Sequence, residues 1–143
     1  MRADARTEAE VRAVLTRLTD SYRQRDLEQL VACFAPDADT VMYGTGVDEK
    51  RMGLDEIRAQ AQRDWDQTDE IAMAFDWTSI SAAGPVAWAA VDGGFKIRAG
   101  GQKFTMPARG TFVLEKRDDK WLVVQSHFSA PAAQQEEGES IPA

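Results

Sequence analysis

The sequence predicts an α+β fold in which three N-terminal helices pack on a strongly curved antiparallel sheet that forms a conical pocket. Apolar residues recur first with the period of helices and then, from Ile71 onward, with the alternating period of strands. Because helical and strand segments are separate along the chain, this pattern favours α+β over an alternating α/β arrangement. The 143 residues fit one domain. We place it at residues 1–130, followed by an acidic, flexible tail at residues 131–143.

The three helices are indicated by their apolar stripes and their caps. The first stripe has helical spacing and consists of Val11, Leu15, Leu18 and Tyr22. A capping box of Thr7 and Glu10 is expected at the start of this helix. Asp26 can cap a second, shorter helix that ends before Pro36, and a third helix is expected after Gly53.

Alternation of large apolar residues with smaller or polar ones predicts four antiparallel strands after the helices. These strands begin near Ile71, Val86, Gln102 and Trp121. Gly93 and Gly94, inside the second strand, indicate a bulge or a sharp bend, because glycine otherwise only weakens strand pairing. Pro107, inside the third, indicates a bulge or a strand edge.

Composition argues against several classes of function. The formal net charge of -7 disfavours a nucleic-acid partner, because phosphate contacts need clustered Lys and Arg. No apolar stretch reaches the roughly 20 residues that cross a bilayer, and the charged first ten residues lack a signal-peptide core. We therefore expect a cytoplasmic protein without a membrane partner. Cys33 is the single cysteine and His127 the single histidine, so a metal site is not expected. Gly44 and Gly46 lack the third glycine and the Lys-Ser/Thr of the phosphate-binding motifs, and no cofactor is expected.

Three segments, in order, resemble the nuclear transport factor 2-like superfamily. They are "CFAPDAD" at 33–39, "GTGVDE" at 44–49 and "KWLVVQSHFSAP" at 120–131. The last is similar to the SnoaL-like branch of the superfamily and to the end of the calcium/calmodulin-dependent kinase II association domain. The resemblance spans residues 7 to 131 and implies the conical fold. This fold hosts isomerases, cyclases, dehydratases, transport factors and oligomerisation modules, so function depends on the site.

Ketosteroid isomerase is the best-known enzyme of this superfamily, and its catalytic residues are absent from the matching positions. The position of its catalytic aspartate falls here on Met42 or Tyr43. The position of its oxyanion-hole tyrosine falls on Leu18. Steroid isomerisation by that mechanism is therefore not expected.

His127 and Arg109 are the catalytic candidates, with Asp92 as a third. Alternation from Trp121 places His127 and Trp121 on one face of the last strand. If that face lines the concavity with Arg109, His127 would move protons and Arg109 would bind an anion. Asp92, beside the glycine pair, would orient His127 or accept a proton. The alternatives are a histidine bonded to a neighbouring backbone and an aspartate that stabilises the bulge.

Further residues are expected to line the pocket or to support it. The predicted pocket residues are Tyr22, Tyr43, Trp65, Trp88 and Thr111. Asp48 and Glu49 precede the third helix. A structural role is expected for such loop carboxylates, and general acid–base work is the alternative.

Two hypotheses for function follow. In the first, the protein binds a small apolar or anionic ligand and acts as a cofactor-independent isomerase, cyclase or dehydratase through His127 and Arg109. In the second, it is a non-catalytic ligand-binding or dimerisation module resembling the kinase II association domain. A homodimer through the outer face of the sheet is also expected, because one small cavity cannot hold all the large aromatic side chains of the strands. These are Trp77, Trp88, Phe112 and Phe128.

Overall fold

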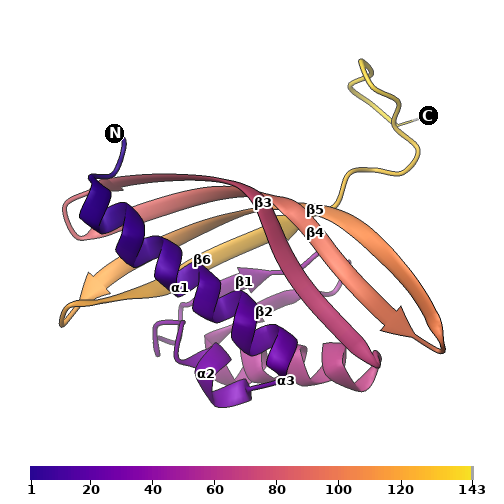
Figure 1. Cartoon of the computed structure of the whole chain (residues 1–143), viewed down its shortest axis with the longest axis horizontal. Helices are drawn as coiled ribbons and strands as arrows, with labels where there is room; N and C mark the ends of the chain where they lie inside the picture. Colours follow the sequence, from indigo (N-terminus) through magenta and orange to yellow (C-terminus); the bar gives the residue numbers. More distant parts are fainter. Residues whose placement is uncertain (143) are drawn as a thin grey trace.

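The computed structural model describes residues 1–142 and confirms the α+β fold: helices cover one face of a curved, six-stranded sheet (Figure 1). The helices are α1 (Ala5–Gln24), α2 (Leu27–Val31) and α3 (Gly53–Asp66). The strands are β1 (Val41–Tyr43), β2 (Lys50–Met52), β3 (Glu70–Ala83), β4 (Val86–Ala99), β5 (Gln102–Arg117) and β6 (Lys120–Ser129). The order across the sheet is β2-β1-β6-β5-β4-β3, and β1 runs parallel to β6.

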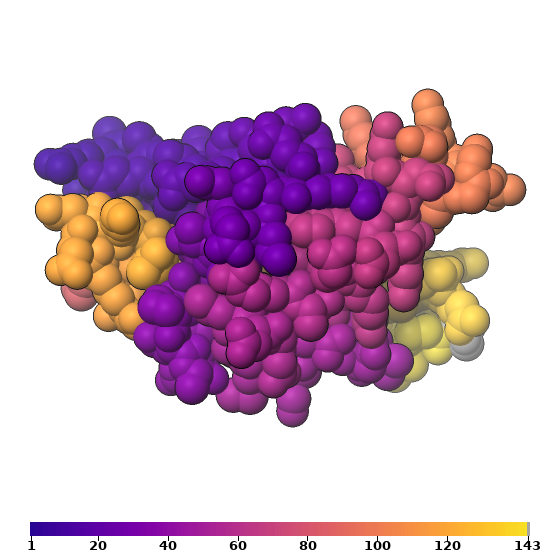
Figure 2. Space-filling model, turned by 90° about the horizontal axis from the view of Figure 1, so that it is seen from below, coloured from indigo at the N-terminus to yellow at the C-terminus, as the bar shows by residue number. Residues whose placement is uncertain are grey.

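The four long strands match the four predicted from alternation, whereas β2 was not predicted. Three residues are too few to show a period, and β2 exists because it pairs with β1. Seen from below, α2 and α3 occupy the centre of the molecule and α1 runs along the top (Figure 2). The β4–β5 turn and the tail lie at one end, and the β5–β6 turn lies at the other. No helix within residues 1–142 is both long and apolar enough to cross a bilayer.

The start of α1 differs from the predicted capping box. Asp4 is the N-cap, and its Oδ1 accepts a hydrogen bond from the Thr7 backbone N–H at 2.7 Å. The helix therefore begins earlier than predicted, and Thr7 lies inside its first turn. This leaves the Glu10 carboxylate free to act elsewhere, because Asp4 already binds an amide that a capping box would need.

Glu10 instead connects α1 to the far end of the sheet. Its Oε2 accepts hydrogen bonds from Trp121 Nε1 at 2.8 Å and from Lys116 Nζ at 3.2 Å, and its Oε1 accepts one from Arg6 Nε at 3.0 Å. These hydrogen bonds lower the pKa of Glu10 from 4.5 to about 2, and the bond from Trp121 has the largest effect.

Two bulges shape the sheet. On β3 the register shifts between Phe75 and Trp77, opposite Gly93. A Cβ on Gly93 would collide with the Ala74 carbonyl oxygen, and one on Gly94 would lie 2.6 Å from the Met106 oxygen. The glycine pair thus permits strands to approach closely at this irregular point. An irregularity was predicted at these glycines, but the extra residue, Asp76, lies on the neighbouring strand β3.

The second bulge lies on β6. Val113 pairs with Gln125 but Leu114 pairs with Val123, so Val124 is an extra residue on β6. One extra residue reverses which side chains face inward. Trp121 and Val123 are buried before the bulge, and Ser126 is buried after it.

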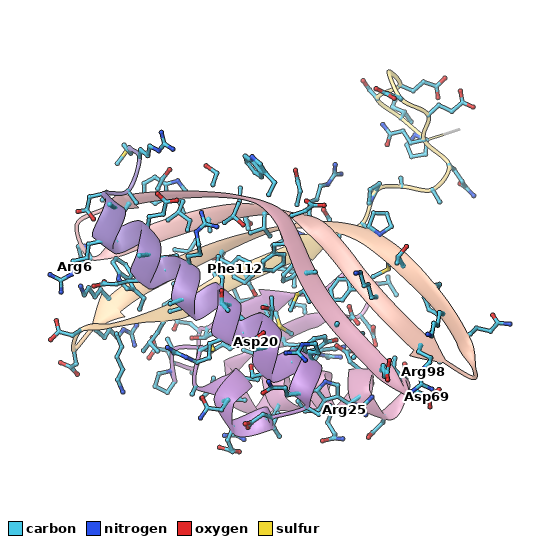
Figure 3. All side chains as sticks on the ribbon, in the orientation of Figure 1. Arg6, Asp20, Arg25, Asp69, Arg98 and Phe112 are labelled. Atoms are coloured by element: carbon cyan, nitrogen blue, oxygen red, sulfur yellow. The ribbon has the colours of Figure 1, made fainter. Side chains whose placement is uncertain are left out.

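The ends of α1 and α3 are joined at a single junction. Arg25 ends α1 in the left-handed conformation (φ 58°), and its guanidinium donates to the carbonyl oxygens of Trp65 at 2.8 Å, Thr68 at 2.9 Å and Asp69 at 3.0 Å. Trp65 Nε1 donates to the Tyr22 carbonyl oxygen at 3.1 Å. These bonds satisfy carbonyls at the end of α3 and hold it against α1. Figure 3 shows Arg25 at this junction.

The outer face of the sheet carries exposed aromatic side chains. Trp77 is 52% exposed and Trp88 is 37% exposed. Phe112, one of the four aromatic residues expected to exceed the room in the cavity, is instead buried in the core and lines the cavity. Phe128 is partly buried against the same core. The two tryptophans still form an apolar surface of the kind that association covers, so the homodimer stays a prediction.

We expect Glu10→Gln to lower the melting temperature at pH 7, because the charged carboxylate accepts bonds from two cations and an indole. A lowered folded pKa gives stability that is present above the unfolded value of 4.5 and is lost as pH falls towards about 2. The difference from wild type should therefore shrink over that range in thermal unfolding followed by circular dichroism. Glu8→Gln, on the same helix, is the control. A difference that does not change with pH would contradict this role.

We expect light scattering at micromolar concentration to give the mass of a dimer. Trp88→Glu should shift the protein to the monomer, because a carboxylate would be buried in an apolar interface. Val47→Glu is the matched control, because Val47 is fully exposed in a loop. A monomer mass for the unaltered protein would contradict the predicted homodimer.

Candidate functional site

A cavity of about 260 Å³ lies between the helices and the inner face of the sheet. Its walls are mainly apolar and aromatic, and α1, α2, α3 and five of the strands contribute to them. The largest apolar contributors include Phe34, Ile57, Phe95, Phe112 and Phe128. Such a cavity, apolar with a few polar groups, is the usual form of a small-molecule site.

Polar groups gather on the helical side of this cavity, around Asp64 on α3. Asp64 Oδ2 accepts a hydrogen bond from the Tyr22 hydroxyl at 2.8 Å, and Oδ1 accepts one from Gln60 Nε2 at 2.8 Å. Gln60 Nε2 also donates to Glu49 Oε1 at 3.0 Å, and Gln60 Oε1 accepts from Arg51 Nε at 2.9 Å. Gln60 and Asp64 are four residues apart on α3 and therefore lie on one side of the helix.

Glu49 is fixed from its other side by the loop that carries it. Its Oε2 accepts a hydrogen bond from the Gly46 backbone N–H at 2.6 Å, and its Oε1 accepts one from Arg63 Nη2 at 3.2 Å. Arg63 also forms a two-pronged pair with Asp48, at 2.8 and 3.2 Å. The loop carboxylates therefore have the structural role that was expected of them. The Glu49 carboxylate also lines the cavity, where the neighbouring Arg63 partly neutralises its charge.

Asp64 differs from Glu49 because no cation donates a hydrogen bond to it within residues 1–142. Burial raises the pKa of Asp64, and the bonds from Tyr22 and Gln60 only partly oppose this rise. Burial, together with the nearby Asp64 charge, raises the pKa of Tyr22 far above its usual range, so the phenol keeps its proton. A carboxyl group with a raised pKa on an apolar cavity is suited to accept and return a proton.

The predicted catalytic residues lie outside this cavity. His127, Arg109 and Asp92 are exposed and do not line it. The His127 ring lies 5.0 Å from that of Tyr43, centroid to centroid, and Arg109 Nε donates to Ser129 Oγ at 3.2 Å. The predicted placement of His127 was wrong because the extra residue at Val124 reverses the alternation on β6.

Arg109 and the other strand residues were misplaced for a related reason. Phe112 and Gly110 are buried on β5, so Arg109 and Thr111 project from the opposite face. Trp88 is 37% exposed on that face and does not line the cavity. The predicted shared pocket of His127 and Arg109 is therefore absent.

The remaining predicted residues lie at or behind the cavity wall. Tyr22 and Tyr43 line the cavity. Trp65 is buried behind Tyr22, with ring centroids 6.1 Å apart. Sequence reasoning missed Gln60 and Asp64. The sequence did contain an indication of both, because the helical period places them beside the apolar stripe of α3. A polar side chain there is partly withdrawn from water and must find a hydrogen-bond partner or serve a function.

Residues 11–133 match the sequence profile of the SnoaL-like domain. The chain belongs to the SnoaL-like domain family. This membership confirms the resemblance that its sequence motifs indicated, and the matched span includes all of the cavity-lining residues named above. No curated protein sequence matches the chain significantly.

Solved structures with the same fold agree with this membership. A nuclear transport factor 2-like superfamily protein from Salmonella enterica superposes with a TM-score of 0.84 at 21% identity, covering 97% of this chain and 100% of that one. A nuclear transport factor 2-like protein of unknown function from Pseudomonas putida superposes with a TM-score of 0.77 at 20% identity, covering 98% of this chain and 99% of that one. A suggested dehydratase of the nuclear transport factor 2-like family from Streptomyces avermitilis superposes with a TM-score of 0.78 at 18% identity, covering 87% of this chain and 96% of that one. At these identities the likeness concerns the fold.

Asp64 should make the stability of this SnoaL-like domain depend on pH. Burial raises its folded pKa above the ordinary value of 3.8, so the folded state holds its proton to higher pH than the unfolded chain does. Its contribution to stability is therefore complete below the unfolded pKa and is lost as pH rises through the folded pKa. We expect the free energy of unfolding of Asp64→Asn, relative to wild type, to increase as pH rises from 4 to 7.

Urea unfolding at several pH values would measure this trend. Weaker hydrogen bonds to the amide would change the free energy of unfolding by the same amount at every pH. The raised pKa of Asp64 instead makes the difference between variant and wild type change with pH. Asp66→Asn, at the exposed end of the same helix, is the control and should show no such slope. A flat difference for Asp64→Asn, or one that falls with pH, would contradict the assigned electrostatics.

Proposed function

We propose that this SnoaL-like protein binds a small, mainly apolar molecule in the cavity and moves a proton on it through Asp64. The observation that carries the proposal is the placement of Asp64: a carboxyl group in the cavity wall, held by Tyr22 and Gln60, with a pKa that burial raises. The cavity volume of about 260 Å³ lies just below the roughly 300–1,000 Å³ usual for ligand pockets, which favours a small ligand.

The chemistry follows from a carboxylate that can both accept and return a proton. Asp64 would take a proton from a ligand carbon beside a carbonyl. The electron pair of that C–H bond would form a carbon–carbon double bond while the π pair of the carbonyl moves to its oxygen, giving an enolate. When the enolate reforms the carbonyl, a conjugated carbon–carbon double bond can take the proton from Asp64 at its far carbon, which completes an isomerisation. If the neighbouring carbon carries a hydroxyl, the reforming carbonyl instead expels it as the C–O bond breaks, and the departing hydroxide takes the proton from Asp64. Water is then released, which is a dehydration, the activity suggested for the Streptomyces avermitilis neighbour.

Tyr22 and Gln60 would act as positioning residues for this step. Their hydrogen bonds fix the plane of the Asp64 carboxylate and stabilise its charged form. Because the phenol keeps its proton, Tyr22 remains a donor throughout the reaction.

A second candidate is binding without chemistry, and the same bonds favour it. Both Asp64 oxygens already accept a hydrogen bond, which is also what a structural carboxylate requires. The two candidates differ in a measurable property, because only the first needs Asp64 to exchange protons with a bound molecule.

Hydrogen exchange on a bound ketone would separate them. We would incubate the protein with 2-tetralone in D2O near pH 7 and follow loss of the protons beside the carbonyl by NMR. Exchange faster than buffer is expected, and Asp64→Asn should reduce the protein-dependent rate by about 100-fold or more, the range for a lost general base. Asp66→Asn is the matched control and should keep the wild-type rate.

The outcome decides between the candidates. Binding of 2-tetralone with no protein-dependent exchange would favour the binding module. Equal exchange by wild type and Asp64→Asn would contradict the assigned proton acceptor. To tie binding to the cavity, Ala61→Trp should abolish it, because a larger side chain on α3 would fill the cavity.

A further inference from the structure

The inner wall of the cavity contains a buried hydroxyl without a partner. Ser126 on β6 lines the cavity and is 2% exposed. Its Oγ is the one buried side-chain nitrogen or oxygen that lacks a hydrogen-bond partner within residues 1–142. Buried polar groups are almost always paired, so this exception needs an explanation.

The surroundings of Ser126 supply no partner from the sheet. Its cross-strand neighbours are Met42 on β1 and Phe112 on β5, and both line the same cavity. Neither side chain carries a strong donor or acceptor. Leaving a hydroxyl unpaired among such groups costs free energy, which a ligand oxygen in the cavity would recover.

The charges around the cavity restrict what that ligand can be. Glu49 and Asp64 line it, whereas no Lys, Arg or His within residues 1–142 does. Glu49 is offset by Arg63, but Asp64 has no such pair. A ligand carboxylate would therefore lose its hydration without gaining a cation. A ligand ammonium would find Glu49 already paired with Arg63 and both Asp64 oxygens already accepting hydrogen bonds.

We propose that the ligand is uncharged and carries a carbonyl or hydroxyl oxygen that hydrogen-bonds to Ser126, with an apolar body against the aromatic walls. This inference rests on the proposed binding function and names the substrate class of the same cavity. It replaces the anionic ligand considered from the sequence, because Arg109, the residue that would have bound an anion, lies on the outer face.

Four compounds with one bicyclic body would test the proposal: 2-tetralone, tetralin, tetralin-2-carboxylate and 2-aminotetralin. Their dissociation constants would be measured by ligand-detected NMR on wild type, Ser126→Ala and Ser126→Thr. In wild type, 2-tetralone should bind about tenfold more tightly than tetralin, the factor for one added hydrogen bond. The carboxylate and the amine should each bind more weakly than the ketone.

The variants identify the source of that advantage. Ser126→Ala should weaken 2-tetralone about tenfold while leaving tetralin unchanged, and Ser126→Thr should retain the preference for the ketone. Ser126→Ala removes an unpaired hydroxyl and should not lower the melting temperature, which shows that the fold is intact. Ser79→Ala, an exposed serine on β3, is the matched control and should behave as wild type.

Each result bears on one statement. If tetralin and 2-tetralone bind equally, or if Ser126→Ala keeps the preference for the ketone, Ser126 does not bind the ligand oxygen and the inference is wrong, while the proposed function stands. If the carboxylate or the amine binds best, the uncharged class is wrong. If none of the four binds, both the inference and the proposed binding function fall.

Discussion

The curvature of the sheet depends on two β-bulges, at each of which the pairing register between neighbouring strands shifts by one residue. One lies on β3 opposite Gly93, and the other is the extra residue Val124 on β6. A flat sheet of these long strands would leave no enclosed space beneath the helices. The bulges bend the strands and also decide which side chains face inward. The cavity and its lining therefore have one physical origin.

The helices complete the cavity through a junction that also builds the polar site. Arg25 and Trp65 hold the end of α3 against α1 through backbone carbonyls. The same contact brings the Tyr22 hydroxyl to Asp64. A half-buried carboxyl group such as that of Asp64 costs stability when it ionises, and it lies here at a point where two helices are already tied together. Rigid support of this kind is what a proton-transferring group requires.

Local pattern was enough to predict the elements but not the faces of the strands. Alternation identified the four long strands, and Gly93 revealed its bulge because glycine in a strand is a visible signal. Val124 has no such signal, since valine is as good a strand residue as any. Its bulge is set by pairing with β5, and sequence alone therefore assigned His127 to the wrong side. Asp64 was overlooked although the helical period placed it beside a buried stripe.

The polar groups of the cavity divide between its two walls, and this division has a consequence for specificity. Tyr22, Gln60 and Asp64 come from the helices, whereas the sheet contributes mainly apolar side chains and Ser126. The proposed proton transfer would depend on the first set, whose members hold one another in place. The shape of a bound ligand would depend on the second set, whose side chains are not part of that hydrogen-bond network. Substitutions on the sheet would therefore change which molecule fits without altering Asp64, the group proposed to act on it, as expected of a fold that hosts many chemistries.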